Sequence, residues 1–483
     1  MRHAHTVEQV RAAEAALMAR LPDGALMQRA AAGLAATCAR LLPRVYGARV
    51  LVLAGSGDNG GDALYAGARL ARRGARVEAL LLSPGKAHAA GLAALLAAGG
   101  RVTDDRAAFS AADLVLDGIV GIGGRGGLRP QAQPFATLPR RGRVVAVDVP
   151  SGVDPDTGEV PGAALRADVT VCFGTYKPGL LIDPGAGYAG ALQLVGIGLE
   201  TPEAAVSVLQ HADVARLLPV PAAESDKYRR GVVGVAAGSA RYPGAAVLAV
   251  AGALHGGAGA VRYAGTAAAE VVRRFPETLV TDGGPAGAGK VQAWVAGPGG
   301  GDGAARALAE ALAADVPVLV DADGLTELAR LGPGALAGRR APVLLTPHTG
   351  EAARLLAGAF DGPPPAADDL AATRLATSRR LAAAYRATVL LKGSTTVVAD
   401  PGGAVRVNPT GTSWLATAGS GDVLAGLAGS LLAAGLAPLD AASVAAYLHG
   451  LAGRRAADGA PVTAPEVAAA LPAVWRAVRA GDG

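Results

Sequence analysis

The chain has 483 residues, of which 51% are hydrophobic but only 4% aromatic, and a formal net charge of +5. This length predicts two or three domains, and a charge so mild, with no basic tract longer than pairs such as Arg229-Arg230, argues against nucleic-acid binding. No apolar run is long enough for a membrane span, no signal-peptide core follows Met1, and Cys38 and Cys172 make no metal or disulfide framework. We therefore expect a cytoplasmic protein that binds neither nucleic acid nor membrane.

Short apolar runs alternate with helical stretches through the first half of the chain. A strand at 49–54 precedes a Gly-rich loop and a helix at 62–73, and further buried strands are expected at 76–82, 113–116, 143–147 and 168–173. Continuous apolar strands separated by helices indicate a parallel sheet covered on both faces. The first half is therefore predicted to be a Rossmann-like, doubly wound α/β domain over residues 1–217.

The alternation lapses at a Pro-containing segment near 217–224 and then restarts. Strands are expected at 231–236, 260–263, 291–296, 316–320, 342–345 and 388–391, with helices at 245–254, 303–313, 368–385 and 423–434. A hairpin is expected over 396–400 and 404–408, turned by Asp-Pro-Gly-Gly. The second half thus reads as another α/β domain, over residues 225–483, whose loop chemistry differs from that of the first.

Three loops of the second half follow predicted strands, where open α/β sheets bind ligands: TPHTGE (346–351), LKGSTT (391–396) and NPTGTSWLATAGSGD (408–422). In the last, small residues stand where a helix is about to start, so a phosphate can approach the unpaired N–H groups of that helix. Asp422 then fits a proton acceptor or a metal contact. Three alternatives remain: Asp422 as a helix cap, Lys392 in an ordinary β-turn, and His348 as a surface or core histidine.

A resemblance becomes specific here. The segments GSARYPGAAVLAVAGALHGGAGAV, VAGPGGG, LVDADGL, TPHTGE, LKGSTT and NPTGT…LATAGSGDVLAG, in this order, resemble the ADP/ATP-dependent NAD(P)H-hydrate dehydratases, which have a ribokinase-like fold. The resemblance runs from about residue 225 to the last residue. It departs at His255, where an Arg is common, and at Gly300, which replaces an apolar residue.

The resemblance implies a phosphoryl-transfer site. It implies that Asp422 is catalytic, that the hydrate is bound by Ala245, Gly301, His348 and Asp422, and that nucleotide phosphates are held by Lys392, Gly393, Ser394, Thr395, Thr396 and Gly421. Damaged NADH or NADPH carries a hydroxyl at C6 of its nicotinamide ring, and phosphorylating that poor leaving group makes elimination possible. ADP or ATP is the expected co-substrate, with Mg²⁺ bound to the nucleotide.

The loops of the first half carry oxygen ligands rather than a phosphate-binding signature. AGSGDNGGDALYAGARLA (54–71), LVLDGIVGIGGRGGLR (114–129) and VAVDVPSGVDPDTGEV (145–160) place Asn59, Asp117 and Ser151 at strand ends. If these strands are adjacent, the three side chains converge, and such a nitrogen-poor set suits a hard cation. The alternative is that Asp117 and Asp148 merely cap helices.

These motifs, with LMQRAA (26–31), resemble the NAD(P)H-hydrate epimerases over roughly residues 1–212. The resemblance implies K⁺ on Asn59, Asp117 and Ser151 and implies substrate contacts at Asp58, Asn59, Gly60, Gly61, Asp62, Gly121, Ile122, Gly123, Gly124, Arg125, Gly126, Gly127 and Asp148. Asp148 is the candidate acid/base. Asp58 and Ala63 depart from the usual NNGGDG pattern.

Together the two resemblances predict a bifunctional enzyme that epimerises R- and S-NAD(P)HX and dehydrates the S form to NAD(P)H. Its expected partners are NADHX or NADPHX and ADP or ATP, and we expect a homo-oligomer. One rival is a ribokinase-like kinase for a small alcohol with an accessory domain. Another treats the first half as a non-catalytic binding module whose epimerase site has lapsed through Asp58.

Overall fold

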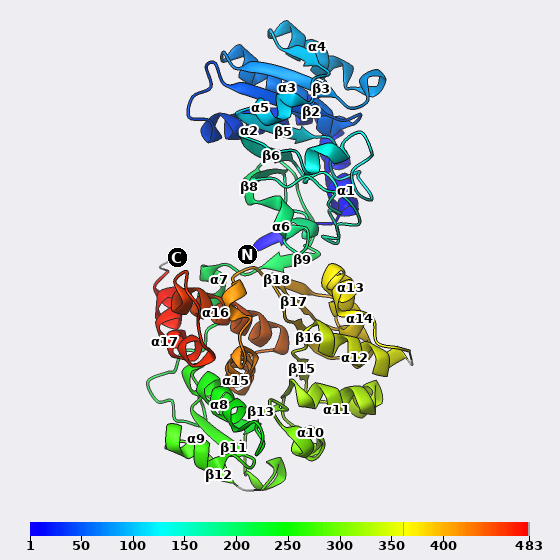
Figure 1. The fold of residues 1–483 in the computed structure, drawn as a ribbon. Coiled ribbons are helices and arrows are strands. Elements are labelled where there is room, and N and C mark those ends of the chain that lie inside the picture. Colours follow the sequence, from blue (N-terminus) through cyan, green and yellow to red (C-terminus); the bar gives the residue numbers. More distant parts are fainter. Residues whose placement is uncertain (282, 361, 482–483) are drawn as a thin grey trace. The chain divides into compact units, whose positions relative to one another are not determined.

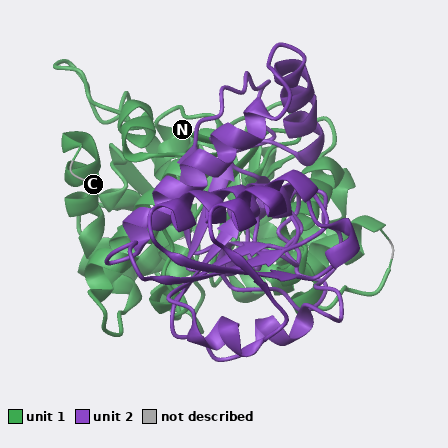
Figure 2. Ribbon diagram, turned by 90° about the horizontal axis from the view of Figure 1, so that it is seen from above, with its two compact units in different colours: residues 1–2, 207–483 green, residues 3–206 purple. Residues whose placement is uncertain are grey.

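The computed structural model describes residues 1–281, 283–360 and 362–481. Two compact units make up the chain, residues 3–206 and residues 1–2 with 207–483 (Figure 2). We call them the N-terminal and the C-terminal unit. The sequence-based limits, 1–217 and 225–483, stay a prediction, and the compact units divide earlier, between Val206 and Ser207. No helix among the described residues is long and apolar enough to cross a membrane.

The N-terminal unit is built on one parallel sheet of seven strands, in the order β4-β3-β2-β5-β6-β7-β8 (Figure 1). Its strands are β2 (Arg49–Ala54), β3 (Arg76–Leu81), β4 (Arg101–Thr103), β5 (Leu114–Gly118), β6 (Arg143–Val147), β7 (Val169–Phe173) and β8 (Ala191–Val195). Alternate residues of β2 enter two different cores, Val50 and Val52 one and Leu51 and Leu53 the other. Both faces of the sheet are therefore covered, which confirms the predicted doubly wound fold.

The helices of this unit are α1 (Val7–Met18), α2 (Ala25–Leu41), α3 (Asp58–Arg72), α4 (Ala89–Ala97), α5 (Ala107–Ala111) and α6 (Ala186–Ala189). Helix α3 begins four residues before its predicted start, because the segment after Gly57 already forms its first turn. The loop before it needs glycine, since a Cβ on Gly55 would lie 1.8 Å from the carbonyl oxygen of Ile119. This close approach joins the end of β2 to the loop that follows β5.

The C-terminal unit is built on a larger, mixed sheet, in the order β1-β9-β18-β17-β16-β15-β14-β13-β10-β11-β12. The strands are β1 (Arg2–Ala4), β9 (Val206–Val208), β10 (Val232–Ala236), β11 (Ala260–Ala264), β12 (Leu279–Thr281), β13 (Ala293–Ala296), β14 (Val318–Val320), β15 (Val343–Leu345), β16 (Thr388–Leu391), β17 (Thr396–Ala399) and β18 (Val405–Asn408). Strands β10 to β16 pair in parallel, whereas β16, β17 and β18 are antiparallel. The predicted hairpin is thus confirmed.

Helices of this unit are α7 (His211–Leu217), α8 (Pro243–His255), α9 (Ala268–Arg274), α10 (Ala304–Ala313), α11 (Asp323–Leu331), α12 (Thr349–Phe360), α13 (Ala367–Ala372), α14 (Arg374–Tyr385), α15 (Ser420–Ala433), α16 (Pro438–Ala457) and α17 (Ala464–Ala480). The single helix predicted over 368–385 is wrong: Thr373, with φ −117° and ψ 40°, separates α13 from α14.

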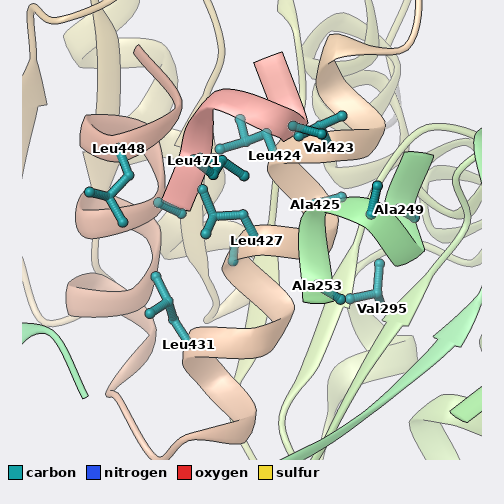
Figure 3. Close-up of a cluster of buried hydrophobic side chains, with 14 of the residues drawn as sticks. Ala249, Ala253, Val295, Val423, Leu424, Ala425, Leu427, Leu431, Leu448 and Leu471 are labelled. Carbon is teal, nitrogen blue, oxygen red and sulfur yellow. The ribbon is translucent and has the colours of Figure 1, made fainter. Parts of the chain in front are cut away.

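Helix α15 is held deep in this unit. Leu427 and Leu431 of α15, Leu448 of α16 and Leu471 of α17 share one core with residues of α8 (Figure 3). Helices α15 and α8 approach backbone to backbone, because a Cβ on Gly426 would lie 1.9 Å from the carbonyl oxygen of Ala249. This packing fixes the first turn of α15, which carries Asp422.

Candidate active sites

The three predicted cation ligands of the N-terminal unit come together. Asp117, at the end of β5, is fully buried and accepts hydrogen bonds from the Ser151 backbone N–H (2.9 Å) and from Ser151 Oγ (2.6 Å). A Cβ on Gly121 would lie 2.8 Å from Asn59 Oδ1, so Asn59 faces the same loop after β5. Strands β2, β5 and β6 are neighbours, as the convergence required. Burial raises the pKa of Asp117 to about 6, although Ser151 donates to it.

A cavity of about 550 Å³ opens above these strand ends. Of the predicted substrate contacts, those lining it are Asp58, Asn59, Asp62, Gly121, Ile122, Gly123, Gly124, Arg125, Gly126, Gly127 and Asp148. Gly60 and Gly61 are not among its lining residues. They allow close packing instead, since a Cβ on Gly60 would lie 2.5 Å from the carbonyl oxygen of Gly55.

Asp148 follows β6 in a strained backbone conformation, with φ at 68°. Its Oδ1 accepts hydrogen bonds from the Phe173 backbone N–H (2.9 Å) and from the ammonium of Lys177. Lys177 is fully buried and also donates to the carbonyls of Phe173 (3.3 Å) and Thr175 (3.2 Å). The orientation of the Asp148 carboxylate is therefore fixed by a lysine that the sequence analysis did not single out.

In the C-terminal unit, Asp422 lies in the first turn of α15. This helix begins directly after Gly419, whose φ is 85°. Burial, with the nearby charge of Asp321, raises the pKa of Asp422 to about 7, against the opposing charge of Lys392. A carboxyl group with this pKa exchanges a proton readily near neutral pH. The N-cap position of α15 is Gly419, so Asp422 stands inside the first turn and not at the N-cap.

Lys392, directly after β16, stands among carboxylates. Its Nζ lies 2.7 Å from Asp321 Oδ1 and 3.7 Å from Glu351 Oε2, and a Cβ on Gly421 would lie 3.6 Å from it. Burial lowers the pKa of Lys392, but the charges of Asp321 and Glu351 outweigh it and the pKa is raised. The KGST loop and the first turn of α15 therefore meet at this ammonium.

The other predicted hydrate contacts are more widely placed. Gly301 lines a second cavity, of about 520 Å³, and its N–H donates to Asp323 Oδ2 at 2.9 Å. Ala245 is not among the residues lining that cavity; it packs against the loop after β13, because a Cβ on Gly299 would lie 2.6 Å from the Cβ of Ala245. His348 lies at the start of α12, where its Nδ1 accepts the Gly350 N–H (3.0 Å) and its Nε2 is 3.5 Å from Glu351 Oε1.

Comparison with known proteins finds relatives of both units. Residues 23–179 match the model of the YjeF-related protein N-terminus, and residues 233–472 match that of NAD(P)H-hydrate dehydratase. The bifunctional NAD(P)H-hydrate repair enzyme Nnr of Mycobacterium tuberculosis is 52% identical over 452 residues, 92% of each chain. The enzyme of the same name from Mycobacterium leprae is 50% identical over 481 residues, 98% of each chain.

The chain belongs to the family of bifunctional NAD(P)H-hydrate repair enzymes.

Solved structures resemble the C-terminal unit of this family member. The Bacillus subtilis protein YxkO is 30% identical, with a TM-score of 0.50 over 56% of this chain and 99% of that chain. A Bacillus subtilis ADP/ATP-dependent NAD(P)H-hydrate dehydratase, co-crystallised with ATP and Mg²⁺, is 32% identical, with a TM-score of 0.49 over the same shares. The predicted ribokinase-like fold and the predicted family are thereby confirmed.

Three charged residues that contact predicted site residues were not predicted from the sequence. Lys177 bonds to Asp148 across 29 positions, and Asp321 bonds to Lys392 across 71. Glu351 ends the TPHTGE motif but was passed over in favour of His348. Asp321 directly follows β14 and Glu351 lies in the first turn of α12 after β15, and β14, β15 and β16 are consecutive parallel strands of the sheet.

Two departures from the family patterns have local explanations. His255 Nδ1 donates to the Ala468 carbonyl at 2.6 Å, so it ties α8 to α17. Gly300 lies in the loop before α10, where a Cβ would meet Ala304 at 3.0 Å. Neither residue touches Asp422 or Lys392 in any interaction of the described residues.

Proposed function

We propose that the C-terminal unit dehydrates S-NAD(P)HX at the expense of ADP or ATP, and that the N-terminal unit interconverts the R and S hydrates. The observation that carries the first activity is the meeting of Asp422, Lys392 and the Gly421 turn at one point. For the second activity, the convergence of Asn59, Asp117 and Ser151 beside a cavity is the supporting arrangement. Nonenzymatic hydration yields both epimers, so the two activities in one chain consume the whole mixture.

In the dehydratase reaction, Asp422 accepts the proton of the C6 hydroxyl as that oxygen attacks the terminal phosphate of the nucleotide. The N–H groups at the start of α15 and the ammonium of Lys392 carry the phosphate charge. Lys392 to Thr396 and Gly421 hold the nucleotide, while Ala245, Gly301 and His348 contact the hydrate. Phosphate then leaves C6, and loss of a ring proton restores the reduced nicotinamide.

The carboxylates around Lys392 fit a nucleotide that arrives with Mg²⁺. Asp321, Glu351 and Asp422 surround a single ammonium, so the site has excess negative charge before any ligand binds. Oxygen ligands of this kind suit Mg²⁺, which commonly binds through one or two carboxylates and substrate phosphates. Asp321 and Glu351 would hold the ion, whose charge would offset that of the phosphates.

The arrangement in the N-terminal unit fits K⁺. Among the described residues, Asp117 has no ion pair although it is fully buried. A buried carboxylate without a counter-charge is costly, and a cation held by Asn59, Asp117 and Ser151 would remove that cost. Such an ion would neutralise charge beneath the substrate, while Asp148 serves as the acid/base. Cytoplasmic location and self-association remain predictions.

The test is recovery of reduced-nicotinamide absorbance from mixed hydrate epimers, with ADP and ATP supplied in separate reactions. Complete recovery is expected with at least one nucleotide, because epimerisation feeds the S form to the dehydratase. Recovery that stops when the S epimer is exhausted would contradict the epimerase assignment. Phosphorylation of small alcohols without hydrate repair would favour the kinase alternative instead.

A further inference from the structure

Four carboxylates line the cavity of the N-terminal unit: Glu14 of α1, Asp58 and Asp62 of α3, and Asp148 after β6. Within the described residues only Asp148 among them forms an ion pair, with Lys177. The remaining three share a cavity whose carboxylates repel one another.

Asp62 is the most enclosed of those three. It is only 9% exposed, and its Oδ1 is buried without a hydrogen-bond partner among the described residues. Burial, followed by the charges of Asp148, Asp58 and Glu14, raises the pKa of Asp62 well above its usual value. An ionised carboxylate in such a place would be unusually costly, whereas a neutral carboxylic acid has a proton to donate.

We propose that Asp62 is the proton donor of the epimerase reaction and that Asp148 is its base. The proposal rests on the epimerase function proposed above and names the second of the two groups which that reaction needs. One carboxylate is paired with a buried lysine and the other is unpaired, on the same cavity. Pairs of carboxylates whose surroundings differ in this way divide acid and base roles between them.

The chemistry balances with these two groups. The carboxylate of Asp148 takes the proton of the C6 hydroxyl, the C6–O bond becomes a carbonyl, and the electrons of the C6–N1 bond move to N1. N1 takes the proton of Asp62, which opens the ring to an aldehyde. After rotation about C5–C6, N1 adds to the other face of the carbonyl, N1 returns its proton to Asp62, and Asp148 returns the other proton to oxygen. No proton or electron is consumed.

Groups from several packed elements affect the protonation of Asp62. Its own helix contributes Asp58, and the charged or titratable side chains on the surrounding elements are Arg11, Glu14, His88, Arg125, Arg129, Asp148 and Lys177. The charges that act on Asp62 are those of Asp148, Asp58 and Glu14, and all three raise its pKa. The local balance therefore favours the protonated form of Asp62.

The test compares native protein with Asp62→Asn, which keeps the size of the side chain but has no acidic proton. We expect the epimerase turnover to fall about 10²- to 10⁴-fold, with the KM for the hydrate little changed. The native rate should decline on the alkaline side, as Asp62 loses its proton, and this decline should be missing from the residual rate of the variant. Turnover close to native, or a variant that keeps the alkaline decline, overturns the proposal.

A matched control is Asp168→Asn, in the same unit but not among the residues lining the cavity, where Asp168 pairs with Arg140. Its epimerase rate should equal that of native protein. If native protein itself fails to equilibrate R and S hydrates, the proposed function is wrong. If native protein is active and Asp62→Asn matches it, only the role of Asp62 is wrong.

Infrared spectroscopy supplies a readout independent of turnover. At neutral pH, native protein should show a stronger carbonyl band of protonated carboxylic acid than Asp62→Asn, because the contributions of Asp117 and Asp422 are common to both proteins and cancel in the difference spectrum. An identical band in both proteins overturns the proposal. If Asp62→Asn does not fold, the smaller uncharged Asp62→Ser replaces it in both comparisons, with dehydration by the C-terminal unit reporting on the amount of active chain.

Discussion

Single residues in both units show how burial prepares a carboxyl group for proton transfer. Asp422 is surrounded by Asp321, Asp323 and Glu351, whose charges add to the effect of burial in raising its pKa to about 7. A base works best when its pKa is close to the operating pH. The sequence predicted the residue and its role, but only the structure shows the neighbouring carboxylates that adjust its acidity.

Asp422→Asn should remove the proposed base while preserving the size of the side chain. Dehydration of S-NADHX should fall about 10²- to 10⁴-fold, and R/S equilibration on the same sample should keep its rate. Because the base must be unprotonated, the native kcat/KM for dehydration should rise with pH through about 7, and this rise should disappear from the variant. A near-normal dehydration rate in the variant would show that Asp422 is a structural residue and not the base.

The same substitution should not reduce stability. The folded pKa of about 7 lies above the reference value of 3.8, so the folded state binds this proton more tightly than the unfolded chain does. Ionisation of Asp422 therefore lowers the free energy of unfolding as pH rises between those values. Above pH 7 the thermal midpoint of Asp422→Asn should equal or exceed that of native protein, and a lower midpoint would contradict this reasoning.

Asp117→Ala tests the cation site at the same scale. The change removes an oxygen ligand and leaves the buried Ser151 N–H without its acceptor, which should cost roughly 1–3 kcal/mol of stability. Epimerase activity should fall and respond less to added K⁺. Dehydration of pure S hydrate should be unaffected. An unchanged K⁺ response would leave Asp117 as a structural hydrogen-bonding group.

Secondary-structure elements were predictable where one strand leads through a short loop into one helix. The expected strands at 49–54, 143–147 and 388–391 match β2, β6 and β16 residue for residue, because continuous apolar runs mark buried parallel strands. The split between α13 and α14 was missed, since nothing in the residues around Thr373 breaks a helix. Contacts such as Lys177 to Asp148 were also missed, because they depend on how separate elements pack.

Close packing of α15 on α8 gives a prediction at this scale. Gly426→Ala would place a Cβ 1.9 Å from the carbonyl oxygen of Ala249, so the helices must separate and the turn holding Asp422 must shift. We expect a loss of about 1–3 kcal/mol in unfolding free energy, measured by denaturant, together with reduced dehydration. Gly244→Ala, in α8 with open space around it, is the matched control and should be neutral or slightly stabilising. Equal stability of the two variants would contradict the packing argument.

At the scale of the whole molecule, each unit has its own sheet, core and cavity, which argues that the two activities are separable. The boundary is set by α7. The sequence-based limits assign its residues to the first domain, yet Leu209, Val214 and Leu218 belong to the core of the C-terminal unit. Because an isolated apolar helix of this length has little tendency to form, α7 needs that core to fold.

The position of the domain boundary can therefore be tested with fragments that begin before or after α7. A fragment of residues 207–483 should fold and dehydrate S-NADHX, whereas a fragment of residues 218–483 lacks the buried side chains of Leu209 and Val214. Burial of such side chains contributes about 1.5–3 kcal/mol each, so the shorter fragment should lose roughly 3–6 kcal/mol and unfold at a clearly lower temperature. The melting temperatures of both fragments are compared by circular dichroism. A fragment of residues 1–206 is assayed separately for R/S equilibration. Equal melting temperatures for the two C-terminal fragments would place α7 outside the folding unit, and failure of both to fold would show that the units depend on each other.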